Sequence, residues 1–126
     1  MGIVWHGHYA AFFDEAAAEL RRRIGLSYQD FFEAGLEAPI VQLHIEYFQP
    51  LLLDEEFTVF ASLVWDDAAR LNTEYRIVRK DRSVATAGYT VQVLTQTPSG
   101  QVCVVAPPLL QRLWQRWRAG EFAALS

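Results

Sequence analysis

Apolar side chains recur at every second position through much of residues 40–95, and this period constrains the fold more than any other feature of the chain. Such alternation is typical of strands that bury one face. It predicts four strands, at residues 40–47, 55–65, 70–80 and 84–95, with turn-forming residues between the last three. Strands joined by such short connections are expected to be antiparallel neighbours. A further strand is predicted at residues 101–105.

The same alternation assigns side chains to faces. Side chains that share one face are Val41, Leu43, Ile45 and Tyr47 in the first strand, Phe57, Val59, Ala61, Leu63 and Trp65 in the second, and Ala85, Ala87, Tyr89, Val91 and Val93 in the fourth. A sheet with one apolar face has to be covered by another element.

A helix ahead of the strands can supply this cover. Apolar side chains at helical spacing predict a helix over residues 9–24, namely Tyr9, Phe12, Phe13, Ala16, Leu20 and Ile24. Three arginines at 21–23 complement the dipole at its end, and Gly25 can close it. The small residues Ala85, Ala87 and Gly88 would let this helix approach the sheet closely. A second short helix is predicted over residues 28–34.

The C-terminal region predicts a basic amphipathic helix after Pro107 and Pro108. Leu110, Leu113, Trp114 and Trp117 recur at helical spacing, and arginines occupy the other faces. Such a helix can bind a membrane surface, or it can dock on its own sheet or on a sister subunit. Docking is the favoured interpretation.

Composition narrows the class of protein. With 126 residues, 52% of them hydrophobic, the chain fits a single domain spanning residues 1–126. The formal charge of -4 argues against nucleic acid as a partner. No apolar run is long enough for a membrane span, and the lone Cys103 fits a reducing cytoplasm. His6 and His8 lack a third ligand at metal spacing, so no metal is expected.

The N-terminus carries a more specific motif. Gly2-Ile3-Val4-Trp5-His6-Gly7-His8-Tyr9 runs into the helix with Asp14 and Glu15, and a later segment reads Ile45-Glu46-Tyr47-Phe48-Gln49-Pro50-Leu51 before Asp54. Both segments, in this order, resemble the 4-hydroxybenzoyl-CoA thioesterase-like family of acyl-CoA thioesterases. The resemblance implies an α+β hotdog fold, with an antiparallel sheet of five to six strands wrapped around one long helix, plus the C-terminal helix.

The resemblance also implies an activity, the hydrolysis of an acyl- or aryl-CoA to the free acid and CoA. The backbone N-H at His6, together with Gly7 and the helix start, would polarise the thioester carbonyl, and Asp14 would support the loop. Side chains expected to contact the substrate are Trp5, His8, Tyr9, Phe12, and the turn cations Arg79, Lys80 and Arg82. No cofactor is implied beyond the coenzyme A of the substrate, and a homodimer or homotetramer is expected.

The family's catalytic carboxylate would stand two positions before Met1, and the opening strand is expected to be truncated. Three explanations remain open: a longer natural protein, a catalytic acid moved to Asp14 or Glu15, or a module that binds acyl-CoA or an acyl carrier without hydrolysing it. The first is favoured, because a hotdog domain that begins at Met1 would expose a sheet edge. A hotdog dehydratase is a further alternative, although the expected catalytic pattern of His with Glu or Asp is not found.

Overall fold

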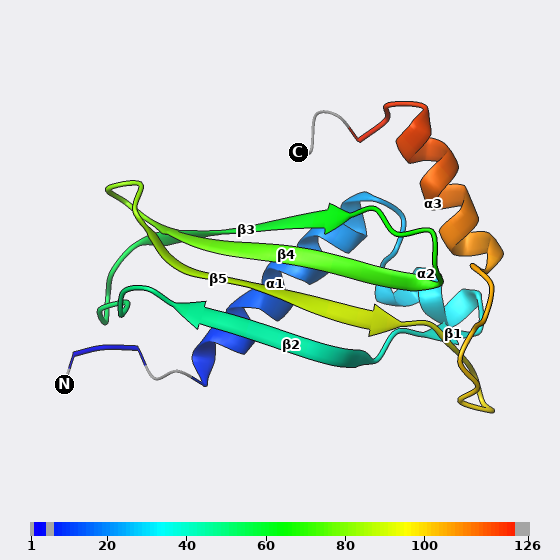
Figure 1. The fold of residues 1–126 in the computed structure, drawn as a ribbon, viewed down its shortest axis with the longest axis horizontal. Helices are drawn as coiled ribbons and strands as arrows, with labels where there is room; N and C mark the ends of the chain where they lie inside the picture. The colour runs from blue at the N-terminus through cyan, green and yellow to red at the C-terminus, as the bar shows by residue number, and fades with distance from the viewer. Residues whose placement is uncertain (1, 5–6, 123–126) are drawn as a thin grey trace.

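A computed structural model describes residues 2–4 and 7–122 of the chain. One long helix, α1 (His8–Arg23), lies behind a four-stranded antiparallel sheet (Figure 1). The strands of this sheet are β2 (Ile40–Tyr47), β3 (Phe57–Val64), β4 (Arg70–Arg79) and β5 (Val84–Val93). Two short strands, β1 (Leu36–Glu37) and β6 (Thr95–Gln96), pair separately. The predicted fold class, an antiparallel sheet wrapped around one long helix, is confirmed.

The order of strands in the main sheet is β2-β5-β4-β3. The hairpins β3–β4 and β4–β5 form as predicted, but β2 and β3 lie at opposite edges. The segment between them crosses the end of the sheet instead of turning back. There, the backbone N-H groups of Phe48 and Gln49 both donate to the carbonyl of Ala85, at 2.9 and 3.1 Å.

The predicted faces hold for β3 and fail for most of β5, where Ala85 is buried in the core as predicted but the positions that follow are not. In β3, Phe57, Val59 and Ala61 pack on the core that α1 covers. In β5, the buried positions include Thr86, Thr90 and Gln92, whereas Tyr89 is 39% exposed. The inward face of β5 is therefore polar, and the predicted set Ala87, Tyr89 and Val91 belongs to the outer face.

Close approach of α1 to the sheet explains the face that β5 turns inward. Gly88 lies under Phe13, and a Cβ atom at Gly88 would come within 2.7 Å of the Phe13 ring. The Phe13 ring in turn stacks on Tyr75, with 4.4 Å between centroids and 5° between planes. The expectation that Gly88 admits the helix is confirmed, and only a residue without a side chain fits at this crossing.

The predicted strand at residues 101–105 does not form. Val102 makes an isolated bridge with Thr95, and the Cys103 N-H donates to Leu94 at 2.8 Å. Val104 and Val105 then leave the sheet and are 91% and 74% exposed. Alternation alone does not make a strand where the following chain has to turn away into a helix.

The helices α2 (Tyr28–Glu33) and α3 (Pro108–Arg118) cover the end of the main sheet that lies away from the β4–β5 turn (Figure 1). The side chain of Ser27 accepts from the Asp30 N-H while the Asp30 carboxylate accepts from the Ser27 N-H, which fixes the start of α2. Leu110, Leu113 and Trp114 of α3 are buried against the chain's own core, in line with the docking interpretation. No helix in the described part of the chain is both long and apolar enough to cross a membrane.

Candidate functional site

The start of α1 is the point where the sequence motif meets the fold. Gly7 takes the N-cap position with φ -66° and ψ -19°, and it has no side chain that could cap the helix. The first turn of α1 contains no acidic residue. The first N-H groups of a helix lack intrahelical acceptors and carry a partial positive charge. This helix start can therefore offer donors to an external oxygen.

Contacts of Tyr9 hold the start of α1 in place. Tyr9 is 2% exposed, and its hydroxyl oxygen accepts a hydrogen bond from the Leu51 N-H at 3.2 Å. The Tyr9 ring meets Tyr47 of β2 edge to face, with 4.9 Å between centroids. Because Tyr9 is buried and its hydrogen bond to Leu51 is buried with it, α1 begins at a fixed position relative to the end of β2 and the segment that follows it.

The residues before the helix are held by the same segment. The Val4 N-H donates to the Leu51 carbonyl at 2.8 Å, and the Leu53 N-H donates to the Gly2 carbonyl at 2.9 Å. Residues 2–4 thus run extended beside residues 51–53 and lead towards the helix start. Trp5 and His6, which were predicted to contribute to the site, lie outside the described residues.

The remaining N-terminal candidates have different settings. His8 is the first residue of α1 and is exposed. Tyr9 is committed to the core, and Phe12 is partly buried against Phe57, with 5.0 Å between ring centroids. Asp14 is exposed in the second turn. Of these, His8 and Asp14 are the side chains that solvent or a ligand can reach most easily.

A polar network that sequence reasoning missed lies between α1 and the inner face of the sheet. The Arg21 guanidinium donates to the Gln92 side-chain oxygen at 3.2 Å, and the Gln92 amide donates to the Ala38 carbonyl at 2.7 Å. The hydroxyls of Tyr75 and Thr90 are 3.0 Å apart. Burial raises the pKa of the Tyr75 hydroxyl, so this group is a neutral hydrogen-bonding partner at physiological pH.

This network could have been suspected only in part. Arg21 lies in the last turn of α1, where its charge complements the helix dipole. The sequence therefore gives no reason to expect its hydrogen bond to Gln92 as well. Gln92 was assigned to the outward face of its strand. The signal that could have found them is a polar residue in a strand that otherwise alternates, because buried polar groups need partners.

The cations predicted to bind the substrate sit at the turn between β4 and β5, at the end of the sheet from which residues 2–4 approach (Figure 1). The Arg79 guanidinium pairs with Glu55 and donates to the Gln49 side chain at 3.0 Å, so it ties this turn to residues 49–55. The Lys80 ammonium lies 3.8 Å from Glu56, with both side chains more than 80% exposed. Arg82 has φ 74° within the turn.

A groove of about 820 Å³ opens at the other half of α1, between that helix, α2 and β1. Arg21 and Arg22 stand on its rim, and Phe31, Leu36 and Ala38 provide much of its apolar wall. Since α1 rises about 1.5 Å per residue, the groove and the helix start of one copy are well separated along the helix. No group of three His, Cys, Asp or Glu side chains suited to a metal occurs within residues 2–4 and 7–122.

A comparison with protein families decides what kind of protein carries this site. The model of the thioesterase-like superfamily matches residues 1–113, which include the helix start and the whole main sheet. The chain belongs to the thioesterase-like superfamily. This finding confirms the family resemblance drawn from the N-terminal motif.

Individual relatives agree with this thioesterase-like assignment. The chain is 33% identical over 86 residues to a "Putative esterase" of Aquifex aeolicus, which covers 68% of this chain and 67% of that protein. It is 25% identical over 111 residues to a "Putative esterase" of Synechocystis, covering 87% and 67%. The fold is similar to a DHNA-CoA thioesterase from Staphylococcus aureus, with TM-score 0.82, 21% identity, and 98% and 85% of the two chains covered.

Two features of α1 bear on the chemistry of a thioesterase-like chain. The helix start has no capping side chain at Gly7 and can offer N-H donors to an oxygen of a ligand. Asp14 is the first carboxylate along α1, and it lies in the second turn. The assignment of individual residues to catalysis or binding remains a prediction.

Proposed function

We propose that this protein is an acyl-CoA thioesterase that hydrolyses an acyl- or aryl-CoA thioester to the free acid and CoA. The observation that carries the proposal is the open start of α1, fixed by the Tyr9–Leu51 hydrogen bond, in a chain of the thioesterase-like superfamily. A thioester needs donors aimed at its carbonyl oxygen, and a helix start free of a capping side chain provides them.

In the proposed reaction, a carboxylate or a water molecule that it activates attacks the thioester carbonyl carbon. The carbonyl electron pair moves onto oxygen, where the backbone N-H at His6, together with Gly7 and the helix start, would stabilise it. The carbonyl double bond then re-forms as the carbon–sulfur bond breaks, and the CoA sulfur leaves with the electron pair and takes up a proton. Where water is the attacking group, its proton passes to the carboxylate and the acid is released directly. Where the carboxylate itself attacks, the acyl group is left joined to it as an anhydride, and a water molecule hydrolyses this anhydride to release the acid and restore the carboxylate. The carboxylate is expected just ahead of the Gly2-Ile3-Val4 segment, with Asp14 or Glu15 as the alternatives.

We further propose that two copies join through the edges of β2. Within the described part of the chain β5 is the only strand that pairs with β2, and Leu43 and Tyr47 on the helix-facing side of β2 are 48% and 49% exposed. A second copy would pair the free edge and cover these side chains. A two-fold axis through this edge makes the two α1 helices antiparallel. The start of α1 in one copy then lies beside the C-terminal half of α1 in the other copy, which is the half that borders the groove.

Within this assembly the turn cations Lys80 and Arg82 would meet the phosphates of coenzyme A, while Arg79 positions the turn. Exposed basic side chains on a turn are suited to a phosphate that remains partly solvated. The acyl group would then extend between the two copies. Trp5, His8 and Phe12 remain the proposed contacts of its thioester end.

The test is release of free thiol from short-chain, long-chain and aromatic acyl-CoAs. Cys103 is a free thiol and would add to the signal, so the assay uses Cys103→Ser as the parent chain. The same panel is run on a version extended through the upstream reading frame. Thiol release above the uncatalysed rate by either form supports a thioesterase, and Asp14→Asn and Glu15→Gln then show whether either acid serves a short active chain.

Binding of acyl-CoA without hydrolysis would contradict the proposal. If neither form releases thiol but acyl-CoA binds in calorimetry, the chain is a binding module that does not hydrolyse its ligand, and the catalytic proposal fails. Turnover of hydroxyacyl-CoA to the unsaturated product, without thiol release, would instead assign a dehydratase.

A further inference from the structure

Arg21 lines the groove between α1, α2 and β1, and its guanidinium has no carboxylate partner within the described part of the chain. Glu19 of the same helix pairs with Arg22 and Arg23 instead, at 2.8 and 3.0 Å. The Arg21 side chain is partly buried, and it donates to the neutral side chain of Gln92 at 3.2 Å. Burial of a cation is costly when no opposite charge accompanies it, so this position favours the binding of an anion.

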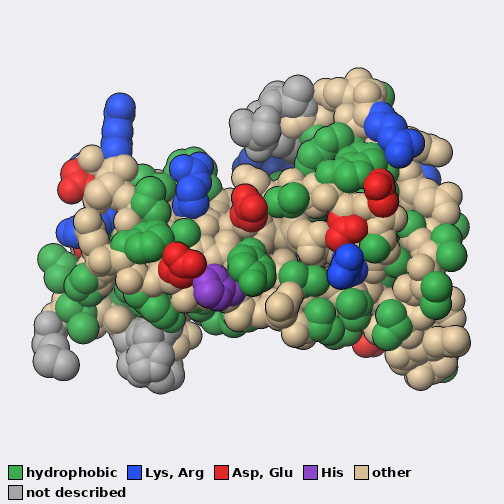
Figure 2. Space-filling model, in the orientation of Figure 1, with side chains coloured by type: hydrophobic (Ala, Val, Ile, Leu, Met, Phe, Trp, Pro, Cys, Tyr) green, Lys and Arg blue, Asp and Glu red, His purple; other side chains and the backbone are tan. Residues whose placement is uncertain are grey.

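The surroundings of Arg21 differ from those of cations on the outer face of the main sheet. On that face, which is turned away from α1, acidic side chains lie close to basic ones (Figure 2). The groove wall beside Arg21 is largely apolar. Phe31 and Leu36 in this wall are buried, whereas Tyr28 and Phe32 are 84% and 68% exposed. Exposed aromatic side chains beside an apolar wall are typical of a binding site, and the groove suits a ligand whose apolar stretch ends in an anion.

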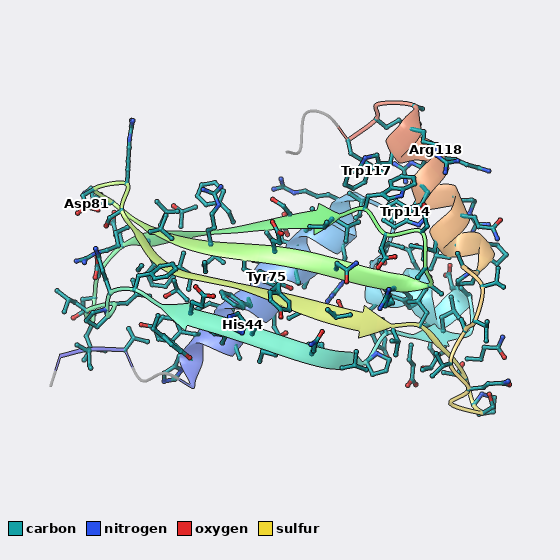
Figure 3. All side chains as sticks on the ribbon, in the orientation of Figure 1. His44, Tyr75, Asp81, Trp114, Trp117 and Arg118 are labelled. Atoms are coloured by element: carbon teal, nitrogen blue, oxygen red, sulfur yellow. The ribbon has the colours of Figure 1, made fainter. Side chains whose placement is uncertain are left out.

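The other titratable groups around Arg21 do not neutralise it. Tyr75, labelled in Figure 3, packs against α1 from β4, and burial raises the pKa of its hydroxyl, so it is uncharged at physiological pH. Asp14 is exposed and lies about two turns earlier on α1. Among the described residues that line the groove, the charged ones are Arg21, Arg22 and the exposed Glu37. The groove is therefore positive, although the chain has a formal charge of -4.

The Arg21 guanidinium is held in place before any ligand binds. Its partner Gln92 is 6% exposed, and the Gln92 amide donates to the Ala38 carbonyl at 2.7 Å, which fixes the position of the Gln92 oxygen. A guanidinium has five N-H donors, and the bond to Gln92 uses one of them. A carboxylate can therefore bind to Arg21, through two parallel hydrogen bonds, without displacing Gln92.

Pairing of two copies through β2, as proposed above, would bring this groove to an active site. The start of α1 in one copy then lies beside the half of α1 in the other copy that borders the groove. A thioester bound at that helix start would extend its acyl chain along the apolar wall towards Arg21 of the other copy. One copy would thus polarise the thioester, while the other would bind the far end of the acyl group.

We propose that Arg21 binds a carboxylate at the far end of the acyl group, so that the substrates of this site are ω-carboxyacyl-CoA thioesters. This inference rests on the proposed thioesterase function and names its substrate class. Hydrolysis then releases a dicarboxylic acid and CoA, by the same bond changes as for any acyl-CoA. An acyl chain that ends in a methyl group would cover the Arg21 guanidinium without supplying a partner, and it would bind less well for that reason.

The test compares pairs of acyl-CoAs that differ only at the far end of the acyl group. Adipyl-, suberyl- and sebacyl-CoA are each measured against an analogue in which an isopropyl group, which has the shape of a carboxylate, replaces the carboxylate. The chain is the Cys103→Ser form that releases thiol, extended upstream or not. For at least one pair, kcat/KM is expected to be about 10- to 100-fold higher for the carboxylate, as for a hydrogen bond to a charged group.

Variants of the last turn of α1 show whether Arg21 is responsible. Arg21→Met is expected to bring the ratio of the two kcat/KM values to about one. Because the ratio compares two substrates on one preparation, any loss of folded protein cancels. Arg23→Met is the matched control and should keep the parental ratio, since Arg23 is in the same turn but does not line the groove. Arg21→Lys keeps the charge without the paired donors, so its ratio should lie between those of Arg21→Met and the parent.

A parental ratio near one for every pair would overturn the proposal, and so would a ratio that Arg21→Met leaves unchanged. If Arg21→Met slows both members of each pair equally, Arg21 binds the phosphates of coenzyme A and not the acyl group.

Failure of the proposed function would look different, because no acyl-CoA would then release thiol. In that case calorimetry measures the dissociation constants of suberyl-CoA and its isopropyl analogue. A preference for the carboxylate that Arg21→Met removes would still support the inference, whereas equal affinities would overturn it.

Discussion

The two ends of α1 are treated in opposite ways. At the C-terminal end, Arg21, Arg22 and Arg23 complement the helix dipole, and the Arg21 carbonyl accepts from the Ile24 and Leu26 N-H groups at 3.2 and 2.9 Å. At the N-terminal end, Gly7 provides no capping side chain and no acid occupies the first turn. The contrast teaches that charged side chains complement one end of this helix, whereas at the other end neither a capping side chain at Gly7 nor an acid in the first turn does so.

The largest expected effect comes from closing the open end. Gly7→Asp places a carboxylate beside the first N-H groups, where it competes with the carbonyl oxygen of the substrate. We expect turnover of acyl-CoA to fall by about 10²- to 10³-fold, as for loss of an oxyanion donor. Stability should stay level or rise by about 0.5 kcal/mol, because an anion suits this helix end.

The control for this change is Gly7→Ala, which adds a side chain without a charge. Thiol release and urea denaturation are measured on both variants. The comparison between the helix ends breaks down if the aspartate variant turns over as fast as the alanine variant.

A second, smaller effect is expected where the middle of α1 crosses the sheet. Gly88→Ala brings a Cβ atom within 2.7 Å of the Phe13 ring and 2.3 Å of the His44 carbonyl oxygen. Overpacking of this kind costs about 1–3 kcal/mol of unfolding free energy, and both ends of the helix shift with it. Thermal unfolding measures the loss, and Thr58→Ala on the exposed side of β3 serves as control. An unchanged melting temperature would mean that α1 does not lie this close.

A third effect, of about 1 kcal/mol, is expected at the closed end. Arg21→Met keeps much of the volume but removes the donor to Gln92, which is 6% exposed and then lacks a partner for its side-chain oxygen. Arg22→Met is the matched control, because Arg22 is exposed and pairs with Glu19. Denaturation midpoints should separate the two variants. Equal losses would assign the effect of Arg21 to the helix dipole alone.

The smallest effect concerns pH. Hydrogen bonds from Arg22 and Arg23 hold the pKa of Glu19 below its ordinary value of 4.5. A lowered pKa contributes stability that is present above 4.5 and disappears as the pH falls through the folded value. When the pH is lowered from 5 to about 3, the free energy of unfolding should therefore fall slightly less for Glu19→Gln than for the parent. Urea denaturation at each pH measures this difference. Glu15→Gln is the control, and parallel curves for all three chains would contradict the expectation.

Local patterns in the sequence were sufficient for the helices and for two hairpins. The helix predicted at residues 9–24 is found at His8–Arg23, because six apolar positions at helical spacing leave little choice of boundary. The strands β3 and β4 follow their alternation for the same reason. The helix start was found by motif, since Gly7 and Tyr9 stand in a fixed order ahead of an apolar face.

The features that the sequence did not predict depend on contacts between residues that are far apart in the chain. The inward face of β5 was misassigned because Thr90 and Gln92 are polar yet buried, and their partners Tyr75 and Arg21 lie far away in the chain. The position of β2 beside β5 cannot be read from the length of any turn. The groove at the far half of α1 likewise arises only when α2 and β1 come together.

The strand order β2-β5-β4-β3 also determines when β2 can pair while the chain is being synthesised. The partner edge for β2 does not exist until β5 has been made, about 40 residues later, which takes a few seconds at 5–20 residues per second. During that interval Ile40–Tyr47 is an apolar segment with no strand of its own chain to pair with. Native pairing of β2 therefore comes late in synthesis, and an unpaired strand in an incomplete chain is exposed to association with other chains until then.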